Sequence, residues 1–400
     1  MKIKKTLSVL LSSVLALGLL AACSSDGDSS SDGNGASDGG TVIKIATQSP
    51  LSGGSSILGE AIRLGAQLKL EEEQAKFEEM GFKLQLVPYD DQADPKKGVS
   101  NAEQLTADEA VYGVVGHLNS GVAIPSSVVY ERFNVPMISP ANTAIEVTDR
   151  GLKTVNRIVA RDDFQGPAGA EYAVKTLGAK KIFVVQDKTA YGTGLADAFK
   201  EAAEGLGAEI VGEEGITIGE KDFNGVVNQF LSKKPDLIYF GGMYSEGGLI
   251  IKQSREKGID VPFMGGDGMD SSGLVDIAGE TVVDTFITSV AGDSNATEAG
   301  KKFTADYKAK FNKDAESYSV YGYDSMGVLL QGIENAIKAN GNKLPDKAKV
   351  AEAVRGVKDY KGALTDVSLD DKGDNVNAKV FLYKFTEASY PPVLEGEVSQ

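Results

Sequence analysis

Hydrophobic and polar positions follow two alternating periods from about residue 42 onwards. Short runs of β-branched and apolar residues, typical of strands, are separated by longer segments whose apolar residues recur every three or four positions, as on one face of a helix. The predicted strands are 42–46, 82–87, 111–116, 135–138, 181–185, 209–211, 236–240, 261–264 and 379–385. The predicted helices are 58–80, 95–107, one starting after 120, 165–177, 194–206, 223–232, 246–257, 299–311 and 321–339. This order favours an α/β protein with two doubly wound lobes, each built around its own parallel sheet.

The first 22 residues have the pattern of a secretory signal. A basic start, Met1–Lys5, is followed by an apolar run, Leu7–Leu20, and by small residues before Cys23. Leu20-Ala21-Ala22-Cys23 resembles the lipobox of bacterial lipoproteins, in which the cysteine thiol carries a diacylglycerol. The apolar run is shorter than the ~20 residues that a comfortable transmembrane helix needs. We therefore expect cleavage before Cys23 and a lipid-anchored protein outside the cytoplasm, with an ordinary cleaved signal or an uncleaved anchor as alternatives.

Residues 23–40 form a predicted linker between the lipid and the folded part. After Cys23 this segment contains only Ser, Asp, Gly, Asn and Ala, so it has nothing to bury and should behave as a flexible coil. The folded part is expected to begin near Thr41. About 360 residues then remain, which is enough for two lobes with their own cores.

Composition and charge narrow the choice of partners. The chain has 42% hydrophobic residues and a formal net charge of −16. Because nucleic acids and anionic lipid headgroups are also negative, this charge argues against both as partners. Cys23 is the only cysteine, so disulfides should play no part in the stability of the mature protein. The expected oligomeric state is a monomer.

Strand-to-helix loops are the expected place for a ligand, because doubly wound sheets bind small molecules beyond the carboxyl ends of their strands. Five such loops are rich in glycine and hydroxyl side chains and poor in base–nucleophile pairs. They cover residues 48–58, 116–121, 139–143, 186–194 and 265–269. The loops therefore favour binding over catalysis.

Catalytic and cofactor motifs give little support to an enzyme. His117 is the only histidine; it could act as a general base, but a histidine at a strand end is more often packed and hydrogen-bonded. No Gly-x-Ser-x-Gly elbow, P-loop or EF-hand spacing occurs, and Gly192-Thr-Gly194 lies too far past its strand to be a good dinucleotide fingerprint. Asp370–Asp374 lacks the later glutamate of a calcium loop. We expect no cofactor and no metal, and a membrane-tethered hydrolase using His117 stays as the alternative from another class.

A series of short motifs occurs in one order along the chain. They are Tyr89-Asp-Asp with Asp94-Pro-Lys-Lys, Gly116-His-Leu, Gln165-Gly-Pro, Asp187-Lys-Thr-Ala-Tyr-Gly-Thr-Gly-Leu-Ala196, Gly219-Glu-Lys-Asp-Phe223, Tyr239-Phe-Gly-Gly242 and Ile277-Ala-Gly-Glu280. In this ordered series, residues 42–385 resemble the leucine/isoleucine/valine-binding proteins. These are substrate-binding subunits of ABC importers with the type I periplasmic-binding fold, so the resemblance implies a permease as partner.

The resemblance also implies a domain organisation. The chain would cross between the lobes three times, near residues 161, 290 and 378. Lobe 1 would comprise 41–161 plus 291–378, and lobe 2 would comprise 162–290 plus 379–400. The lobes would close about these crossovers around a ligand, since hinge closure of this kind occurs in periplasmic binding proteins.

The first part of the implied site receives the ligand's carboxylate. Ser120 matches the family's serine, with Leu118 and Asn119 beside it, and Ala141 and Thr143 match the second loop. Helix starts offer unpaired N–H groups and a positive dipole end, so a carboxylate there is chemically reasonable. Taken without the resemblance, the same residues favour a plain helix cap at Ser120 and an ordinary turn at Thr143.

The second part of the implied site receives the ammonium and the side chain. Asp267 matches the acid that holds the ammonium, and a buried carboxylate indeed needs a cation to offset its desolvation. Tyr191 matches a tyrosine that covers the ligand from lobe 2. Tyr318 stands where the family often packs an aromatic against the ligand side chain, although core packing is an equal reading of a tyrosine there.

Three positions depart from the branched-chain pattern. Leu58 replaces a usual tyrosine, Met243 occupies another tyrosine position beside Tyr244, which could supply the ring after a one-residue shift, and Asp267 replaces a longer glutamate. The expected ligand is a small amino acid, with an aliphatic branched-chain one favoured. Short amides, urea and other polar solutes, which the same receptor class includes, are the alternatives.

Overall fold

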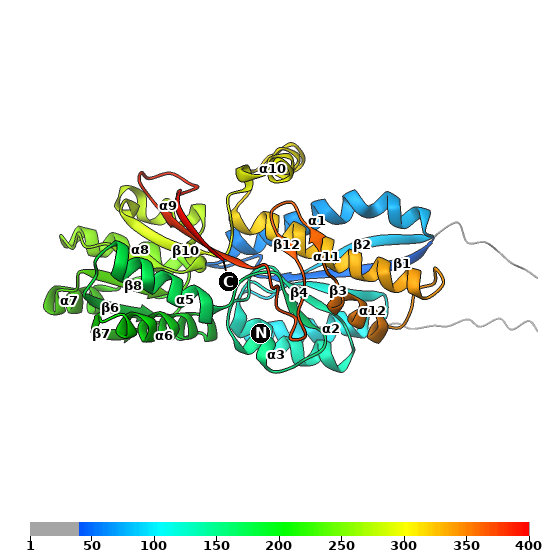
Figure 1. Ribbon diagram of the computed structural model, residues 1–400, viewed down its shortest axis with the longest axis horizontal. Coiled ribbons are helices and arrows are strands. Elements are labelled where there is room, and N and C mark those ends of the chain that lie inside the picture. The colour runs from blue at the N-terminus through cyan, green and yellow to red at the C-terminus, as the bar shows by residue number, and fades with distance from the viewer. Residues whose placement is uncertain (1–39, 400) are drawn as a thin grey trace, which may run out of the picture. The chain divides into compact units, whose positions relative to one another are not determined.

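The structure, a computed structural model, describes residues 40–399 (Figure 1). The predicted signal segment, Cys23 and all but the last residue of the predicted linker lie outside the described residues. Within the described part, the strands form a five-stranded sheet, a seven-stranded sheet and a small two-stranded one. The predicted α/β class is confirmed.

The five-stranded sheet is parallel and has the order β2-β1-β3-β4-β5. Its strands are β1 (Thr41–Ser49), β2 (Phe82–Asp90), β3 (Val111–Gly116), β4 (Met137–Ser139) and β5 (Val155–Arg157). The helices that alternate with them are α1 (Ser56–Glu79), α2 (Pro95–Ala107), α3 (Ser120–Arg132) and α4 (Glu146–Asp149). Helices α1 and α11 (Ser317–Ala339) pack together over one face of this sheet, and α2 packs against α3 on the other (Figure 1).

The seven-stranded sheet has the order β14-β13-β10-β9-β8-β6-β7. Its strands are β6 (Lys181–Gln186), β7 (Glu209–Gly215), β8 (Leu237–Gly241), β9 (Phe263–Gly265), β10 (Thr285–Ser289), β13 (Lys379–Lys384) and β14 (Val393–Ser399). Its helices are α5 (Asp162–Glu171), which continues as a π-helical turn (Tyr172–Thr176), α6 (Ala190–Gly205), α7 (Asn224–Lys233), α8 (Tyr244–Glu256) and α9 (Ser272–Ala278). Strands β13 and β14 pair antiparallel, so this sheet is mixed rather than purely parallel as predicted.

The remaining elements connect the two sheets. They are α10 (Glu298–Phe311), α12 (Lys347–Arg355), β11 (Tyr360–Lys361) and β12 (Asp366–Val367). The chain passes from β5 of the first sheet to β6 of the second, returns after β10 to α11, which packs on α1, and passes again to β13. These are three crossovers, as the type I fold requires; the residue boundaries of the two lobes stay a prediction.

Both sheets share one strand order, which places the loops of interest. When the strands of each sheet are numbered along the chain, the first five lie side by side in the order 2-1-3-4-5. The order reverses at a topological switch point, which lies between β1 and β3 in the first sheet and between β6 and β8 in the second. Ligands of doubly wound sheets bind beyond the carboxyl ends of strands at such switch points. The loops that follow β1, β3, β6 and β8 are therefore the first places to search. No helix among residues 40–399 combines the length and the apolar character needed to cross a membrane.

Candidate functional site

Two loops of the five-stranded sheet are joined by the side chain of Asn142. Its Nδ2 donates to the Leu118 carbonyl at 2.9 Å, and its Oδ1 accepts from the His117 backbone N–H at 3.1 Å. Ser120, the first residue of α3, accepts from the Ala144 N–H through its Oγ at 3.4 Å. The β3–α3 and β4–α4 loops therefore form one surface at the start of α3, where backbone N–H groups have no helical partner.

Asp267 forms the acidic part of the site and follows β9 in the seven-stranded sheet. Its Oδ1 accepts from Gln165 Nε2 at 2.6 Å and from the Tyr191 hydroxyl at 2.8 Å. Its Oδ2 accepts from the Tyr318 hydroxyl at 2.5 Å. Tyr318 belongs to α11, which packs on the first sheet, so this carboxylate is contacted from both sides. Burial raises the pKa of Asp267 to about 6, although the three hydrogen bonds act in the opposite direction.

Helix α5 brings the two parts of the site together. The N–H of Asp162, its first residue, donates to the Thr143 carbonyl at 2.9 Å. One turn later on the same helix, Gln165 donates to Asp267. Because one helical turn rises only ~5.4 Å, the structure brings Ser120, Thr143 and Asp267 to one locus.

Asp162 adds a second carboxylate that the sequence reasoning did not assign to the site. It is 2% exposed, and burial, together with the nearby charge of Asp267, raises its pKa well above the ordinary value. Two buried like charges are unfavourable together unless a cation or a proton intervenes. Gln165 belongs to one of the family motifs, but the motif does not predict its hydrogen bond to Asp267. The available signal was the acidic pair Asp162-Asp163 at the expected crossover, which reads as ordinary helix-start charge.

Several polar atoms of this locus lack a hydrogen-bond partner. Within residues 40–399, the buried atoms without a well-formed hydrogen bond include Asn119 Oδ1, Thr143 Oγ1, Gln165 Oε1 and both carboxylate oxygens of Asp162. The Thr143 hydroxyl is near enough to the Asp162 carboxylate to oppose the rise in its pKa. Leaving such a group unpaired costs ~1–3 kcal/mol, so their gathering at one place is unusual for a purely structural core. The acceptors suit a ligand ammonium, and the hydroxyl-bearing helix start suits a carboxylate. The arrangement can therefore hold a zwitterion.

A cavity of about 560 Å³ adjoins this locus. Three of the predicted residues, Asn119, Ser120 and Tyr191, line it. Other lining residues come from loops and helix starts that follow strands of both sheets; they include Gly54, Ser55, Gln92, Ala93, Pro95, Asp187, Lys188, Met243, Ser245 and Glu246. A Cβ built on Gly54 would lie 3.2 Å from Ser245 Oγ, so the loops following β1 and β8 approach closely at this cavity.

The other predicted residues are also buried. Leu58 is fully buried in the first turn of α1, and Ala141 donates its N–H to Ser139 Oγ at 3.2 Å. Tyr244, the first residue of α8, packs against Gly273, and burial raises its pKa to about 12. It does not line the cavity, whereas the preceding Met243 does. The structure therefore shows no one-residue shift that would bring the Tyr244 ring to the cavity.

His117 directly follows β3 and is part of a buried chain of hydrogen bonds that runs from Asp91 to Gln48. Its Nδ1 is 3.2 Å from Asp91 Oδ2 and its Nε2 is 3.0 Å from the Tyr130 hydroxyl, which donates to Gln48 Oε1 at 3.0 Å. The ring is fully buried. This geometry fits the packed, hydrogen-bonded histidine better than a general base. Among the described residues no group of His, Cys, Asp and Glu side chains is arranged to hold a metal ion.

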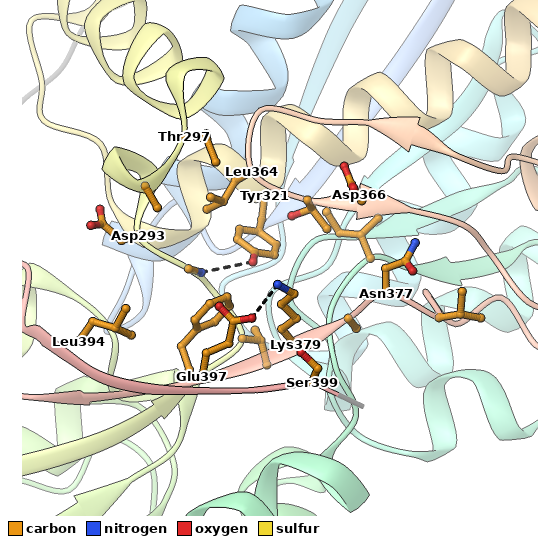
Figure 2. Close-up of a pocket in the computed structure, with 18 residues that line it drawn as sticks. Asp293, Thr297, Tyr321, Leu364, Asp366, Asn377, Lys379, Leu394, Glu397 and Ser399 are labelled. Atoms are coloured by element: carbon orange, nitrogen blue, oxygen red, sulfur yellow. Dashed lines mark hydrogen bonds and ion pairs between the residues drawn. The ribbon is translucent and has the colours of Figure 1, made fainter.

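A second cavity, of about 550 Å³, lies where the connecting segments meet (Figure 2). Ile158, Val290 and Ala378, close to the three predicted crossovers, line it. On its wall Lys379 pairs with Glu397 at 2.6 Å, and the Tyr321 hydroxyl accepts from the Gly292 N–H at 3.4 Å. None of the predicted site residues lines it.

Comparison with known proteins places this geometry in a family. A family described as "Periplasmic binding protein" matches residues 42–389. The Leu/Ile/Val-binding protein BraC3 of Rhizobium johnstonii is 35% identical over 343 residues, which cover 86% of this chain and 91% of that protein.

Two solved structures are similar in fold as well as in sequence. The leucine-binding protein LivK of Thermotoga maritima has a TM-score of 0.81 at 30% identity, covering 89% of this chain and 98% of that one. The branched-chain amino acid transporter substrate-binding protein LivJ of Streptococcus pneumoniae, solved with isoleucine, has a TM-score of 0.80 at 26% identity, covering 90% and 99%. The predicted resemblance is thereby confirmed, and the chain belongs to the periplasmic binding protein family, with the type I fold.

Proposed function

We propose that the protein is the solute-binding subunit of an ABC importer and captures a small amino acid, with a branched-chain one as the first candidate. The observation that carries this proposal is the paired chemistry of the buried locus. Ser120 and Thr143 offer hydroxyls beside a helix start, and Asp162 and Asp267 offer carboxylates one helical turn away. The relatives named for leucine, isoleucine and valine support the same ligand class. We infer that the protein binds its ligand without converting it.

The proposed mechanism is closure of two lobes around the ligand. Lobe 1 would be 41–161 plus 291–378, and lobe 2 would be 162–290 plus 379–400. The contact between Tyr318 of the first and Asp267 of the second can form only when the lobes are together. A ligand that contacts one lobe with its carboxylate and the other with its ammonium binds the closed state more tightly than the open one. It shifts the equilibrium toward the closed state by this difference in affinity.

A polar solute such as a short amide is the second candidate. Asn119 Oδ1 has no partner within residues 40–399, and Asn119 lines the 560 Å³ cavity, as the polar residues Ser245 and Glu246 also do. A ligand side chain that donates a hydrogen bond would satisfy this oxygen, whereas an aliphatic one would not.

A thermal-shift screen is expected to separate these candidates. At a concentration of ~1,000 times its Kd, a ligand of the native state stabilises it by about 4 kcal/mol. We expect at least one standard L-amino acid to raise the melting temperature by several degrees, while acetamide and urea at equal low concentration do not. If no amino acid does so, the proposed function is wrong; a shift by an amide alone would support the second candidate. Turnover of the stabilising ligand would instead support the hydrolase alternative.

The membrane anchor is a separate proposal that depends on Cys23 and the small residues before it. We expect Cys23→Ser to move the protein from the membrane fraction to the soluble or secreted fraction and to abolish labelling with radioactive palmitate. One buried acyl chain gives only marginal attachment, and two or more give a stable one. Ser24→Ala is the matched control and should stay membrane-bound and labelled. Unchanged labelling in Cys23→Ser would contradict the anchor.

A further inference from the structure

Arg157, the last residue of β5, contacts the loop that carries Thr143. Its guanidinium is fully buried. Nη1 donates to the Asn142 carbonyl at 3.0 Å and to the Ala144 carbonyl at 2.9 Å. The Thr143 carbonyl between them accepts from the Asp162 N–H. Three consecutive carbonyls of an irregular loop are thus bound by groups outside it.

Asp374 holds the arginine in place from the far end of the chain. Its Oδ1 accepts from Arg157 Nε at 2.5 Å, and its Oδ2 accepts from Arg161 Nη1 at 3.0 Å. Thr148 Oγ1 accepts from Arg157 Nη2 at 2.5 Å. Although burial opposes it, the Arg157 charge and these hydrogen bonds hold the pKa of Asp374 below its ordinary value. The Asp374 carboxylate therefore stays charged, and these hydrogen bonds give the arginine a fixed orientation.

The planar guanidinium is what allows this arrangement. It reaches two carbonyls, a carboxylate and a hydroxyl at once, in directions set by its fixed fork. A lysine ammonium at the same site has only three donors and no plane, so it cannot bind both carbonyls and the Asp374 carboxylate in the same geometry. Burying the charge of Arg157 is costly, and the packing of helices and strands does not by itself need a buried charge. Its contacts instead converge on the backbone at both sides of Thr143.

We propose that Arg157 is a positioning residue for ligand binding, which fixes the peptide groups on both sides of Thr143 so that this hydroxyl meets the ligand. This inference rests on the proposed function. Arg157 acts through Thr143 and makes no contact with the ligand itself. Asp374 is its support, and it lies in the segment that leads to β13.

A double-mutant cycle tests this coupling. The ligand is the amino acid that gives the largest shift in the thermal screen, and Kd is measured by calorimetry. We expect Arg157→Lys and Thr143→Val each to raise Kd at least tenfold. In Thr143→Val protein, the further change Arg157→Lys should alter Kd less than twofold, because the hydroxyl that the arginine positions is gone.

Arg355→Lys is the matched control. Arg355 Nη2 also donates to two backbone carbonyls, those of Leu152 at 3.0 Å and Val155 at 2.6 Å, but these flank no predicted site residue. It should lower the melting temperature without changing Kd more than twofold. If it raises Kd as much as Arg157→Lys does, the arginines act through general stability and the proposal is overturned.

The remaining outcomes are also decisive. Losses from Arg157→Lys and Thr143→Val that multiply in the double mutant overturn the positioning role and leave the proposed function intact. Wild-type protein that binds no amino acid overturns both. If Arg157→Lys does not fold, Asp374→Asn takes its place in the cycle, since it removes the charge that orients the guanidinium while keeping the side-chain size.

Discussion

Replacing Asp267 by asparagine is expected to weaken amino-acid binding about thirtyfold or more. The carboxylate is 3% exposed, and in the proposed complex it would face the ligand ammonium in a dry site. Removing one partner of a buried, hydrogen-bonded charge pair costs ~2–5 kcal/mol, which corresponds to a factor of about 30 or more. The asparagine N–H groups would also face Gln165 Nε2 or a tyrosine hydroxyl, which donate to the carboxylate in the wild type, so two donors would oppose each other. Calorimetric titration with the amino acid selected in the thermal screen measures the loss.

Asp324→Asn provides the control for this experiment. Asp324 is also fully buried, and burial raises its pKa to about 6 as it does for Asp267. Its carboxylate accepts from the N–H groups of Ala363, Leu364 and Thr365, and it does not line the 560 Å³ cavity. We expect its Kd to change less than threefold. Equal losses in the two variants would contradict the assignment of Asp267 as the ammonium-binding acid.

Acidification is expected to release the ligand as pH falls through about 6. Burial raises the pKa of Asp267 to about 6 in the ligand-free protein, and a bound ammonium would lower it again. Binding then releases a proton, so affinity is complete above this pKa and is lost below it, by up to tenfold per pH unit. The ligand keeps both its charges over this range. Burial also raises the pKa of Asp162, so protonation of this second acid would weaken binding in the same direction.

Titrations between pH 8 and pH 4.5 measure this dependence. Gln165 on α5, Tyr191 on α6 and Tyr318 on α11 donate hydrogen bonds to Asp267; burial raises the pKa of both tyrosines well above its ordinary value, so they stay neutral. The Asp267 charge also acts on Asp162 and on Asp270, and burial raises the pKa of Asp270 to about 7, so Asp270 titrates in the same range. The Asp267→Asn variant should show a weaker dependence in the same range. An affinity that is constant from pH 7 to pH 5 in the wild type would show that Asp267 does not bind a cation.

Elements with strong local signals could be predicted from the sequence. Helix α2 has the predicted bounds because Asp94 accepts from the N–H groups of Lys96 and Lys97 and Pro95 occupies the first helical position. The β3 strand, a short buried run ended by Gly116, also has its predicted bounds. The alternation of such elements was enough for the fold class, because strands separated by helices can form parallel sheets only through crossovers.

Elements whose signals depend on tertiary contacts were missed or shifted. Helix α6 was predicted from Gly194 but begins at Ala190, because the Thr189 side chain accepts from the Gly192 N–H. Tyr191 therefore lies on the first turn of the helix. Strand β14 was not predicted, since its largely exposed residues do not alternate as in a half-buried strand, and its antiparallel pairing with β13 defines it.

The site shows the same division. Ser120 and Thr143 follow strands and could be placed from the loop positions together with the family resemblance. Asp162 could not, because only the crossover from β5 to α5 brings it beside Thr143. Arg157 lies at the end of a strand in the sequence, and the role proposed for it depends on a hydrogen bond to Asp374, 217 positions away.

The juxtaposed acids Asp162 and Asp267 bear on how an unloaded receptor behaves. If the halves came together around nothing, two negative groups would be trapped out of water, or would have to take up protons to remain there. Cargo removes this electrostatic barrier by acting as a mobile counterion. An empty receptor that shuts would therefore carry extra protons at these two acids, and its charge would differ from that of the loaded form which a permease meets.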